Sequence, residues 1–257
     1  MLRHPTLDQL AELKLHGMVR AFEEQLQMEG VAELSFEERL GFLVDREATE
    51  RANRSFESRL RRAKLRELAT IEDLDLRTRR GLDRSQILRL ASCRWIAEHL
   101  NTLIVGPTGI GKTFLSCALA HKACQEGFSA LYLRAPRLFR DLEIARGDGS
   151  FERLLRRFSR IDLLVIDDWG LSRLGDLDRR DLLEILEDRY GRRSTIFSSQ
   201  LPVEKWHEVI GDPTLADGIL DRLIHGAYVL ELHGESMRRK RARGAAEAQT
   251  TQKKATS

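Results

Sequence analysis

One eight-residue stretch constrains the fold of this chain more than any other feature. It reads Gly106-Pro107-Thr108-Gly109-Ile110-Gly111-Lys112-Thr113. An apolar run precedes it at residues 101–105 and a helical run opens at Phe114, which is the strand–loop–helix setting of a phosphate-binding loop rather than of a chance glycine-rich turn. Its glycines let backbone N–H groups approach phosphate oxygens, and the helix N-terminus adds positive charge. The sequence therefore predicts a nucleotide site in which Lys112 neutralises the β- and γ-phosphates and Thr113 binds Mg²⁺.

The third expected strand, at residues 162–168, is apolar and ends in two carboxylates, Asp167 and Asp168. Many strands end in acidic turns, so the pair alone is a weak signal. Following a phosphate loop, it predicts the other half of an NTPase site. Asp167 is expected to hold Mg²⁺ through water, and Asp168 to orient and deprotonate the attacking water.

Strand and helix patterns alternate after the phosphate loop, which predicts a parallel α/β sheet of the P-loop NTPase class. The expected strands cover residues 101–105, 130–133, 162–168, 194–200 and 227–232. Ligands of such sheets bind at the carboxyl ends of the strands. Gln200 ends the fourth strand and is therefore expected to contact the γ-phosphate or the lytic water, with Ser199 as the alternative.

The N-terminal third is expected to be a small helical bundle, in which a capping box at Ser35–Glu38 starts the longest helix. That helix becomes rich in arginine: residues 51–66 hold seven basic side chains and one acidic side chain, Glu57. Such a run is either a solvated face or a surface that contacts DNA phosphates. The candidate DNA-binding residues are Arg51, Arg54, Arg59, Arg61 and Arg62.

The sequence divides the chain into a helical partner or DNA-interaction domain at 1–68, a linker with short helices at 69–100, an ATPase domain at 101–240 and a disordered basic tail at 241–257. Trp95, ahead of the first strand, is interpreted either as a neighbour of the nucleotide base or as a core anchor. The net charge of +3 says little about the partners of the protein. No run is apolar and long enough to span a membrane, the N-terminus lacks the apolar core of a signal peptide, and the three cysteines are wrongly spaced for disulfides or zinc. We therefore expect a cytoplasmic protein.

From about Asp83 to Arg238 the chain resembles AAA+ ATPases and, within them, the IstB-like group, relatives of the DnaC helicase loader. The resemblance is carried by residues 106–113, 132–136, 163–170, 199–202, 206–217, 220–223 and 234–238, and it extends to residues 15–18 and 38–50 in the N-terminal third. IstB-like proteins are helper ATPases encoded beside an insertion-sequence transposase. The resemblance thus implies ATP and Mg²⁺ as cofactors, and duplex DNA, a cognate transposase and further copies of the chain as partners in a prokaryotic cytoplasm.

The resemblance also implies roles for three polar residues. Gln200 takes the first-sensor position, Arg222 corresponds to an arginine finger that reaches the γ-phosphate on a neighbouring subunit, and Arg238 corresponds to the second sensor. Both arginines have salt-bridge roles as alternatives. Positive charge at these places would offset the negative charge that develops during phosphoryl transfer.

The chain departs from the AAA+ pattern at three points. The first-sensor residue, Gln200, stands where Asn is more usual. Asp168 stands where most AAA+ proteins have Glu, so hydrolysis is expected to be slow without a partner, and little chain follows Arg238 to form a helical lid. Three other functions stay open at this level: a helicase loader that uses the same ATPase motifs, a DNA scaffold that binds ATP without turnover, and a small-molecule kinase, which the missing acceptor lid disfavours.

Overall fold

Helices make up the N-terminal part of the protein. The computed structural model describes residues 4–237, apart from the side chain of Ala32, and divides the chain into two units, residues 1–58 and 59–257. The boundary expected at residue 68 falls inside the second unit. The elements of the first unit are α1 (Pro5–Glu12), α2 (His16–Gln27), η1 (Val31–Glu33) and the start of α3 (Phe36–Ala63), which runs on into the second.

The capping box predicted at the start of α3 is confirmed. The Glu38 backbone N–H donates to Ser35 Oγ at 3.2 Å, and the Ser35 N–H donates to Glu38 Oε2 at 2.8 Å. Farther along α3, the buried carboxylate of Glu47 accepts hydrogen bonds from the backbone N–H groups of Gly17 and Met18. This carboxylate serves the N-terminus of α2, which has no side-chain cap of its own, and so ties α2 to α3.

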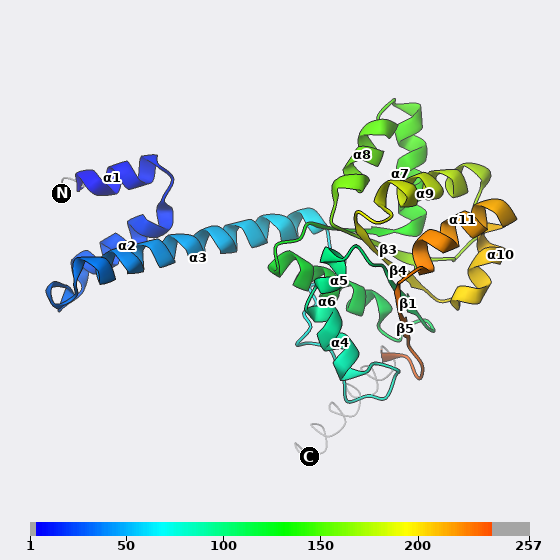
Figure 1. The fold of residues 1–257 in the computed structure, drawn as a ribbon, viewed down its shortest axis with the longest axis horizontal. Coiled ribbons are helices and arrows are strands. Elements are labelled where there is room, and N and C mark those ends of the chain that lie inside the picture. Colours follow the sequence, from blue (N-terminus) through cyan, green and yellow to red (C-terminus); the bar gives the residue numbers. More distant parts are fainter. Residues whose placement is uncertain (1–3, 238–257) are drawn as a thin grey trace, which may run out of the picture. The chain divides into compact units, whose positions relative to one another are not determined.

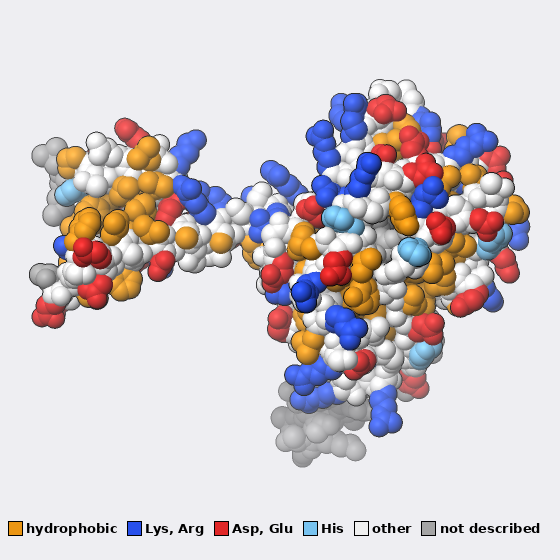
Figure 2. Space-filling view, in the orientation of Figure 1, with side chains coloured by type: hydrophobic (Ala, Val, Ile, Leu, Met, Phe, Trp, Pro, Cys, Tyr) orange, Lys and Arg blue, Asp and Glu red, His pale blue; other side chains and the backbone are white. Residues whose placement is uncertain are grey.

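Apolar side chains remain on the surface of the first unit (Figure 2). Phe36 is 65% exposed and Met28 is 59% exposed, and Leu26, Leu40, Phe42 and Val44 are exposed as well. The apolar side chains at the start of α3 therefore lie partly on the surface instead of in a core. Exposed apolar groups gathered in one region are typical of a surface that binds a partner.

The second unit contains the predicted parallel sheet (Figure 1). Within residues 59–237 its order is β2-β3-β4-β1-β5, and every neighbouring pair is parallel. The strands are β1 (Thr102–Val105), β2 (Ala130–Arg134), β3 (Leu163–Trp169), β4 (Ser194–Ser199) and β5 (Tyr228–Glu231). All five lie within about a residue of their predicted positions, so the predicted fold class is confirmed.

Helices cover both faces of this sheet (Figure 1). They are α4 (Arg84–Ala91), α5 (Arg94–Ala97), α6 (Lys112–Gln125), α7 (Ala135–Gly147), α8 (Phe151–Arg160), α9 (Asp176–Arg189), η2 (Val203–Lys205), α10 (Trp206–Ile210) and α11 (Pro213–Ile224). Helices α4 to α6 lie on one face. On the other face, α7 to α11 enclose a core in which Trp169, Phe197 and Trp206 pack edge to face or tilted, with ring centroids 5.4–6.0 Å apart.

Trp95, which had two interpretations, is a core residue. It lies in α5, is 2% exposed, and its indole N–H donates to the Leu90 carbonyl at 2.9 Å. It does not line the cavity described below. Cys117 and Cys124 are buried free thiols in α6. None of the helices in residues 4–237 is long and apolar enough to cross a membrane.

Candidate functional site

The phosphate loop joins the end of β1 to the start of α6, and its backbone requires glycine. Gly111 has φ of 105° directly before α6, and Gly106 has φ of 150°. A Cβ atom at Gly106 would lie 2.4 Å from the Leu232 carbonyl oxygen, which follows β5. The loop therefore fits closely against the neighbouring chain at the carboxyl edge of the sheet, where the ligands of parallel sheets bind.

Lys112 is the first residue of α6, and its ammonium group is folded back under the loop. Its Nζ donates to the carbonyls of Gly106 at 2.6 Å and Pro107 at 2.9 Å. Burial lowers the pKa of Lys112, while the carboxylates of Asp167 and Asp168 oppose that shift. The cation is thus placed at the centre of the loop, where a bound phosphate would be an additional anionic partner.

Asp167 is almost completely buried and accepts hydrogen bonds from three hydroxyl groups. Thr113 Oγ1 donates to its Oδ2 at 2.8 Å, the Tyr132 hydroxyl donates to the same oxygen at 2.5 Å, and Ser198 Oγ donates to Oδ1. Burial and then Asp167 itself raise the pKa of Tyr132, so this phenol stays protonated and remains a donor.

The pairing of Thr113 with Asp167 gives the chemistry of a magnesium site. Hydroxyl and carboxylate oxygens are ligands that Mg²⁺ prefers, and the ion usually takes its remaining ligands from water and substrate phosphates. No cluster of three or more His, Cys, Asp or Glu side chains able to hold a metal occurs in the described part of the chain. The donor set therefore fits a metal that arrives with a phosphate ligand better than a metal held by protein groups alone.

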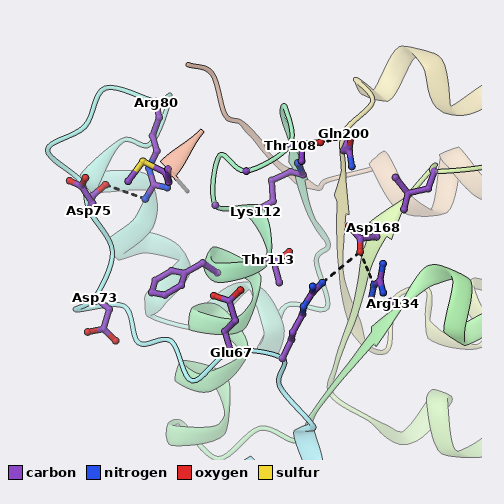
Figure 3. Close-up of a pocket in the computed structure, with 16 residues that line it drawn as sticks. Glu67, Asp73, Asp75, Arg80, Thr108, Lys112, Thr113, Arg134, Asp168 and Gln200 are labelled. Atoms are coloured by element: carbon purple, nitrogen blue, oxygen red, sulfur yellow. Dashed lines mark hydrogen bonds and ion pairs between the residues drawn. The ribbon is translucent and has the colours of Figure 1, made fainter. Parts of the chain in front are cut away.

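Asp168 follows at a break in the sheet. The register of β3 against β4 shifts between Ile166 and Trp169, and Asp168 has φ of +58°. Its Oδ2 lies 2.8 Å from Arg134 Nε (Figure 3). Arg66 Nη1 lies 3.8 Å from the same oxygen. The irregularity turns this carboxylate out of the strand and towards the cavity, which is a frequent effect of bulges next to functional sites.

Several of these groups line one cavity of about 360 Å³, a size suited to a small-molecule ligand (Figure 3). Of the predicted site residues, the structure brings the following to its wall: Thr108, Gly109, Gly111, Lys112, Thr113, Phe114, Asp168 and Gln200. Gln200 Oε1 accepts a hydrogen bond from Thr108 Oγ1 at 2.6 Å. Ser199, the alternative to Gln200, is fully buried and donates to the Trp169 carbonyl.

Sequence reasoning missed one wall of the cavity. Residues 66–80, which it treated as the end of a helix and a linker, contribute Arg66, Glu67, Asp73, Asp75 and Arg80. Arg80 is 5% exposed, and its Nη1 donates to the Ile110 carbonyl inside the phosphate loop at 2.8 Å. Nothing in the sequence distinguishes this arginine from its neighbours Arg77 and Arg79. Tyr132 and Ser198 could have been found, because both lie near the carboxyl ends of strands beside β3.

Arg222 is not in this cavity. It belongs to α11, where its Nη2 pairs with Glu187 Oε1 at 2.9 Å and its Nη1 donates to the Gly218 carbonyl. The Arg222 carbonyl accepts from Asn101 Nδ2 just before β1, at the edge of the sheet opposite the phosphate loop. Arg222 therefore cannot serve the nucleotide cavity of its own chain. Arg238 lies outside the described residues.

The five candidate DNA-binding arginines differ in their contacts. Arg51 pairs with Glu47 at 2.6 Å, and Arg59 Nε donates to the Cys124 carbonyl at 2.8 Å. Arg54, Arg61 and Arg62 are exposed on α3.

The sheet order, the phosphate loop and the acidic end of β3 are those of the AAA+ P-loop fold. Solved structures share the fold: DnaI aligns with a TM-score of 0.56 and 24% identity over 69% of this chain and 94% of that one. A DnaA replication initiator bound to AMPPCP and single-stranded DNA aligns with a TM-score of 0.54 and 17% identity over 67% of this chain and 53% of that one.

Sequence comparison identifies the family. The family of IstB-like ATP binding proteins matches residues 8–245, so the chain belongs to this family. An insertion sequence ATP-binding protein of Sinorhizobium fredii, y4pL, is 54% identical over 95% of this chain and 99% of its own length. The corresponding protein of insertion sequence IS21 from Pseudomonas aeruginosa is 33% identical over 92% of this chain and 89% of its own.

Proposed function

We propose that this chain is an ATP-dependent, DNA-binding helper protein of transposition. It oligomerises on duplex DNA, hydrolyses ATP, and recruits or regulates a partner transposase at the target DNA. One observation carries the proposal: Lys112, Thr113 and Asp168 line one cavity, with Asp167 hydrogen-bonded to Thr113, in a chain whose relatives are insertion sequence ATP-binding proteins. Those relatives also favour transposition over the loading of a replicative helicase.

Binding is assigned to residues 106–114. Their backbone N–H groups and the N-terminus of α6 surround the phosphates, and Lys112 moves its donors from two loop carbonyls to the β- and γ-phosphates. Thr113 and Asp167 hold Mg²⁺, with Tyr132 and Ser198 orienting the Asp167 carboxylate. When bound, the metal neutralises part of the phosphate charge.

Hydrolysis is assigned to polar residues at the carboxyl ends of two strands, β3 and β4. Asp168 accepts a proton from the attacking water, and Gln200 donates a hydrogen bond that orients that water or the γ-phosphate. Asp is one methylene shorter than the Glu that most AAA+ proteins have there. A slow basal rate that rises with DNA or a partner follows from this shorter reach.

A second copy of the chain completes the site in this proposal. Arg222 lies too far from its own cavity, so it neutralises the γ-phosphate of a neighbouring subunit, and Arg238 acts as the second sensor. An arginine supplied in trans makes hydrolysis depend on assembly. The exposed arginines of α3 contact DNA phosphates without reading sequence, and the apolar surface around Phe36 and Met28 binds the transposase.

Sedimentation tests the proposal. The mass of the protein is measured in four conditions: alone, with a non-hydrolysable ATP analogue, with duplex DNA, and with both. We expect a large assembly when both are present, and phosphate release from ATP that duplex DNA stimulates. A protein that stays monomeric in all four conditions contradicts the proposal. Hydrolysis that DNA never stimulates favours an ATP-binding scaffold, and pull-down of a replicative helicase instead of the transposase favours a helicase loader.

A further inference from the structure

The hydroxyl of Thr108 joins the phosphate loop to the side chain of Gln200 at the end of β4. Thr108 Oγ1 donates to Gln200 Oε1 at 2.6 Å, and both residues line the cavity (Figure 3). An amide whose oxygen accepts this bond carries its two N–H donors on its other arm. In Figure 3 the amide nitrogen of Gln200 points to the side of the cavity on which Asp168 lies. Gln200 therefore presents donors, and not its oxygen, towards the proposed general base.

The main chain on both sides of Gln200 is held in place. The Ser199 carbonyl accepts from the Gly106 N–H at 3.1 Å, and the Leu201 N–H donates to Ser199 Oγ at 3.1 Å. Ser199 is buried, and its Oγ donates to the Trp169 carbonyl at the end of β3. The backbone of Gln200 is thus fixed against the phosphate loop and β3, which leaves only its side chain to be placed.

The phosphate loop also holds Thr108 on both sides. Gly106 is fixed to β4 as described, and the Gly109 carbonyl accepts from the Met237 N–H at 2.9 Å. A side chain at Gly109 would clash with Ser236, so the segment after β5 packs closely against the loop. Thr108 stands between these two anchored glycines, and its branched Cβ restricts its own rotation. Its hydroxyl is therefore a well-placed donor.

The side chain of Gln200 needs such a partner. Glutamine has one more rotatable bond than the asparagine that is more usual at this position, and fixing a long side chain costs conformational entropy. Gln200 and Thr108 are both exposed, so no packing around the amide holds it. A freely rotating amide would also turn its oxygen towards the water, and that oxygen cannot donate to the water or to a phosphate.

We propose that Thr108 is a positioning residue that holds the Gln200 amide with its N–H groups towards the attacking water or the γ-phosphate. The inference rests on the proposed role of Gln200 in hydrolysis. A water that accepts from this amide has its own O–H groups free to donate to Asp168. The loop itself binds phosphate through backbone N–H groups, so the Thr108 hydroxyl contributes to turnover and not to ATP affinity.

The effect is expected to be modest, because water competes for an exposed hydrogen bond. A net hydrogen bond within a protein changes an equilibrium by about two- to tenfold. Loss of the Thr108 hydroxyl should therefore lower the turnover number by about two- to tenfold.

The test measures kcat and KM for ATP hydrolysis by the full chain with duplex DNA. Thr108→Val, which keeps the shape but removes the hydroxyl, should lower kcat and leave KM for ATP unchanged. Thr108→Ser keeps the hydroxyl and should stay near the wild type. Thr49→Val is the matched control, because Thr49 is exposed on α3 and does not line the cavity. It should leave both constants unchanged.

A double variant provides a readout that a merely structural role would not give. If Thr108 acts through Gln200, the combination of Thr108→Val with Gln200→Ala should be as slow as Gln200→Ala alone. If the two residues act independently, the two losses in kcat should multiply instead, and that result contradicts the inference.

Two further results overturn the inference. An unchanged kcat in Thr108→Val shows that the hydroxyl does not position the amide, and a raised KM with unchanged kcat shows that it binds ATP instead. Gln200→Ala separates this failure from failure of the proposed function. If Gln200→Ala hydrolyses ATP as fast as the wild type, the assignment of Gln200 to hydrolysis is wrong. If it is slow while Thr108→Val is as fast as the wild type, only the positioning role is wrong.

Discussion

The Tyr132 hydroxyl and Thr113 Oγ1 donate to the same carboxylate oxygen, Oδ2 of Asp167, at 2.5 and 2.8 Å. Tyr132 comes from β2 and Thr113 from α6, so Asp167 on β3 joins three elements at the edge of the cavity. A buried carboxylate is stable only when donors satisfy it, so these hydroxyls support the fold as well as the site.

Replacing Tyr132 with Phe should therefore destabilise the protein even without nucleotide. Loss of a hydrogen bond to a buried charged group costs about 1.5–3 kcal/mol. Urea unfolding of the nucleotide-free protein would measure this decrease in the free energy of unfolding. Tyr190→Phe is the control, because Tyr190 is 47% exposed and its loss of a hydroxyl should change stability by less than about 0.5 kcal/mol. Equal effects of the two substitutions would mean that the Tyr132 hydroxyl contributes nothing to holding Asp167.

Lys112→Ala should remove most of the affinity for ATP. Its Nζ is the buried cation inside the loop, and charge-assisted hydrogen bonds contribute about 1.5–3 kcal/mol, so the dissociation constant should rise by about ten- to a hundredfold or more. Titration with a fluorescent ATP analogue measures this. Lys122→Ala removes a lysine from the same helix that pairs with Glu126 at 2.5 Å instead. It should bind ATP normally, and a Lys112→Ala protein that does the same would exclude the phosphate-loop assignment.

The sequence could predict residues that belong to motifs between recognisable strands and helices. The phosphate loop is predicted because it stands between a strand and a helix, and Asp167 and Asp168 because they end an apolar strand. The alternation of strands and helices predicts the parallel sheet. Arg80 and Arg189 could not be predicted. Arg189 is 1% exposed and donates to the carbonyls of Phe158, Ile161 and Ser194. In a chain with 43 Lys and Arg residues, only tertiary contacts separate such an arginine from a solvated one.

Arg222→Ala should stop hydrolysis while ATP binding stays near normal. An arginine finger contributes at least about a thousandfold to turnover, whereas the partly exposed pair of Arg222 with Glu187 contributes about 1 kcal/mol or less to stability. Glu187→Ala removes the same ion pair but keeps the arginine, so it should hydrolyse ATP normally. Measurement of kcat for both variants separates the catalytic role from the structural one.

Mixing two inactive variants tests whether Arg222 acts on a neighbouring subunit. Asp168→Asn lacks the proposed base and Arg222→Ala lacks the finger, so each is expected to be inactive alone. In mixed assemblies some interfaces combine an intact Asp168 with an intact Arg222, and part of the activity should return. If every mixing ratio stays inactive although mixed assemblies form, or if Arg222→Ala alone hydrolyses ATP at the normal rate, a finger in trans is wrong.

The end of α3 allows a test of DNA contact within one arginine run. Arg61 and Arg62 are exposed, whereas Arg59 donates to the Cys124 carbonyl. Each phosphate contact that is lost should lower the slope of log K against log salt by about 0.9. Arg61→Ala and Arg62→Ala should therefore weaken binding to duplex DNA of any sequence and flatten its salt dependence.

Arg59→Ala is the control. It should lower the free energy of unfolding by about 1 kcal/mol and leave the slope unchanged, because the Arg59 guanidinium is already hydrogen-bonded within the protein. DNA affinities over a range of salt concentrations, with urea unfolding alongside, would decide this. Equal slopes for all three variants and the wild type would mean that the end of α3 is a solvated face, since lost phosphate contacts always appear in the salt dependence.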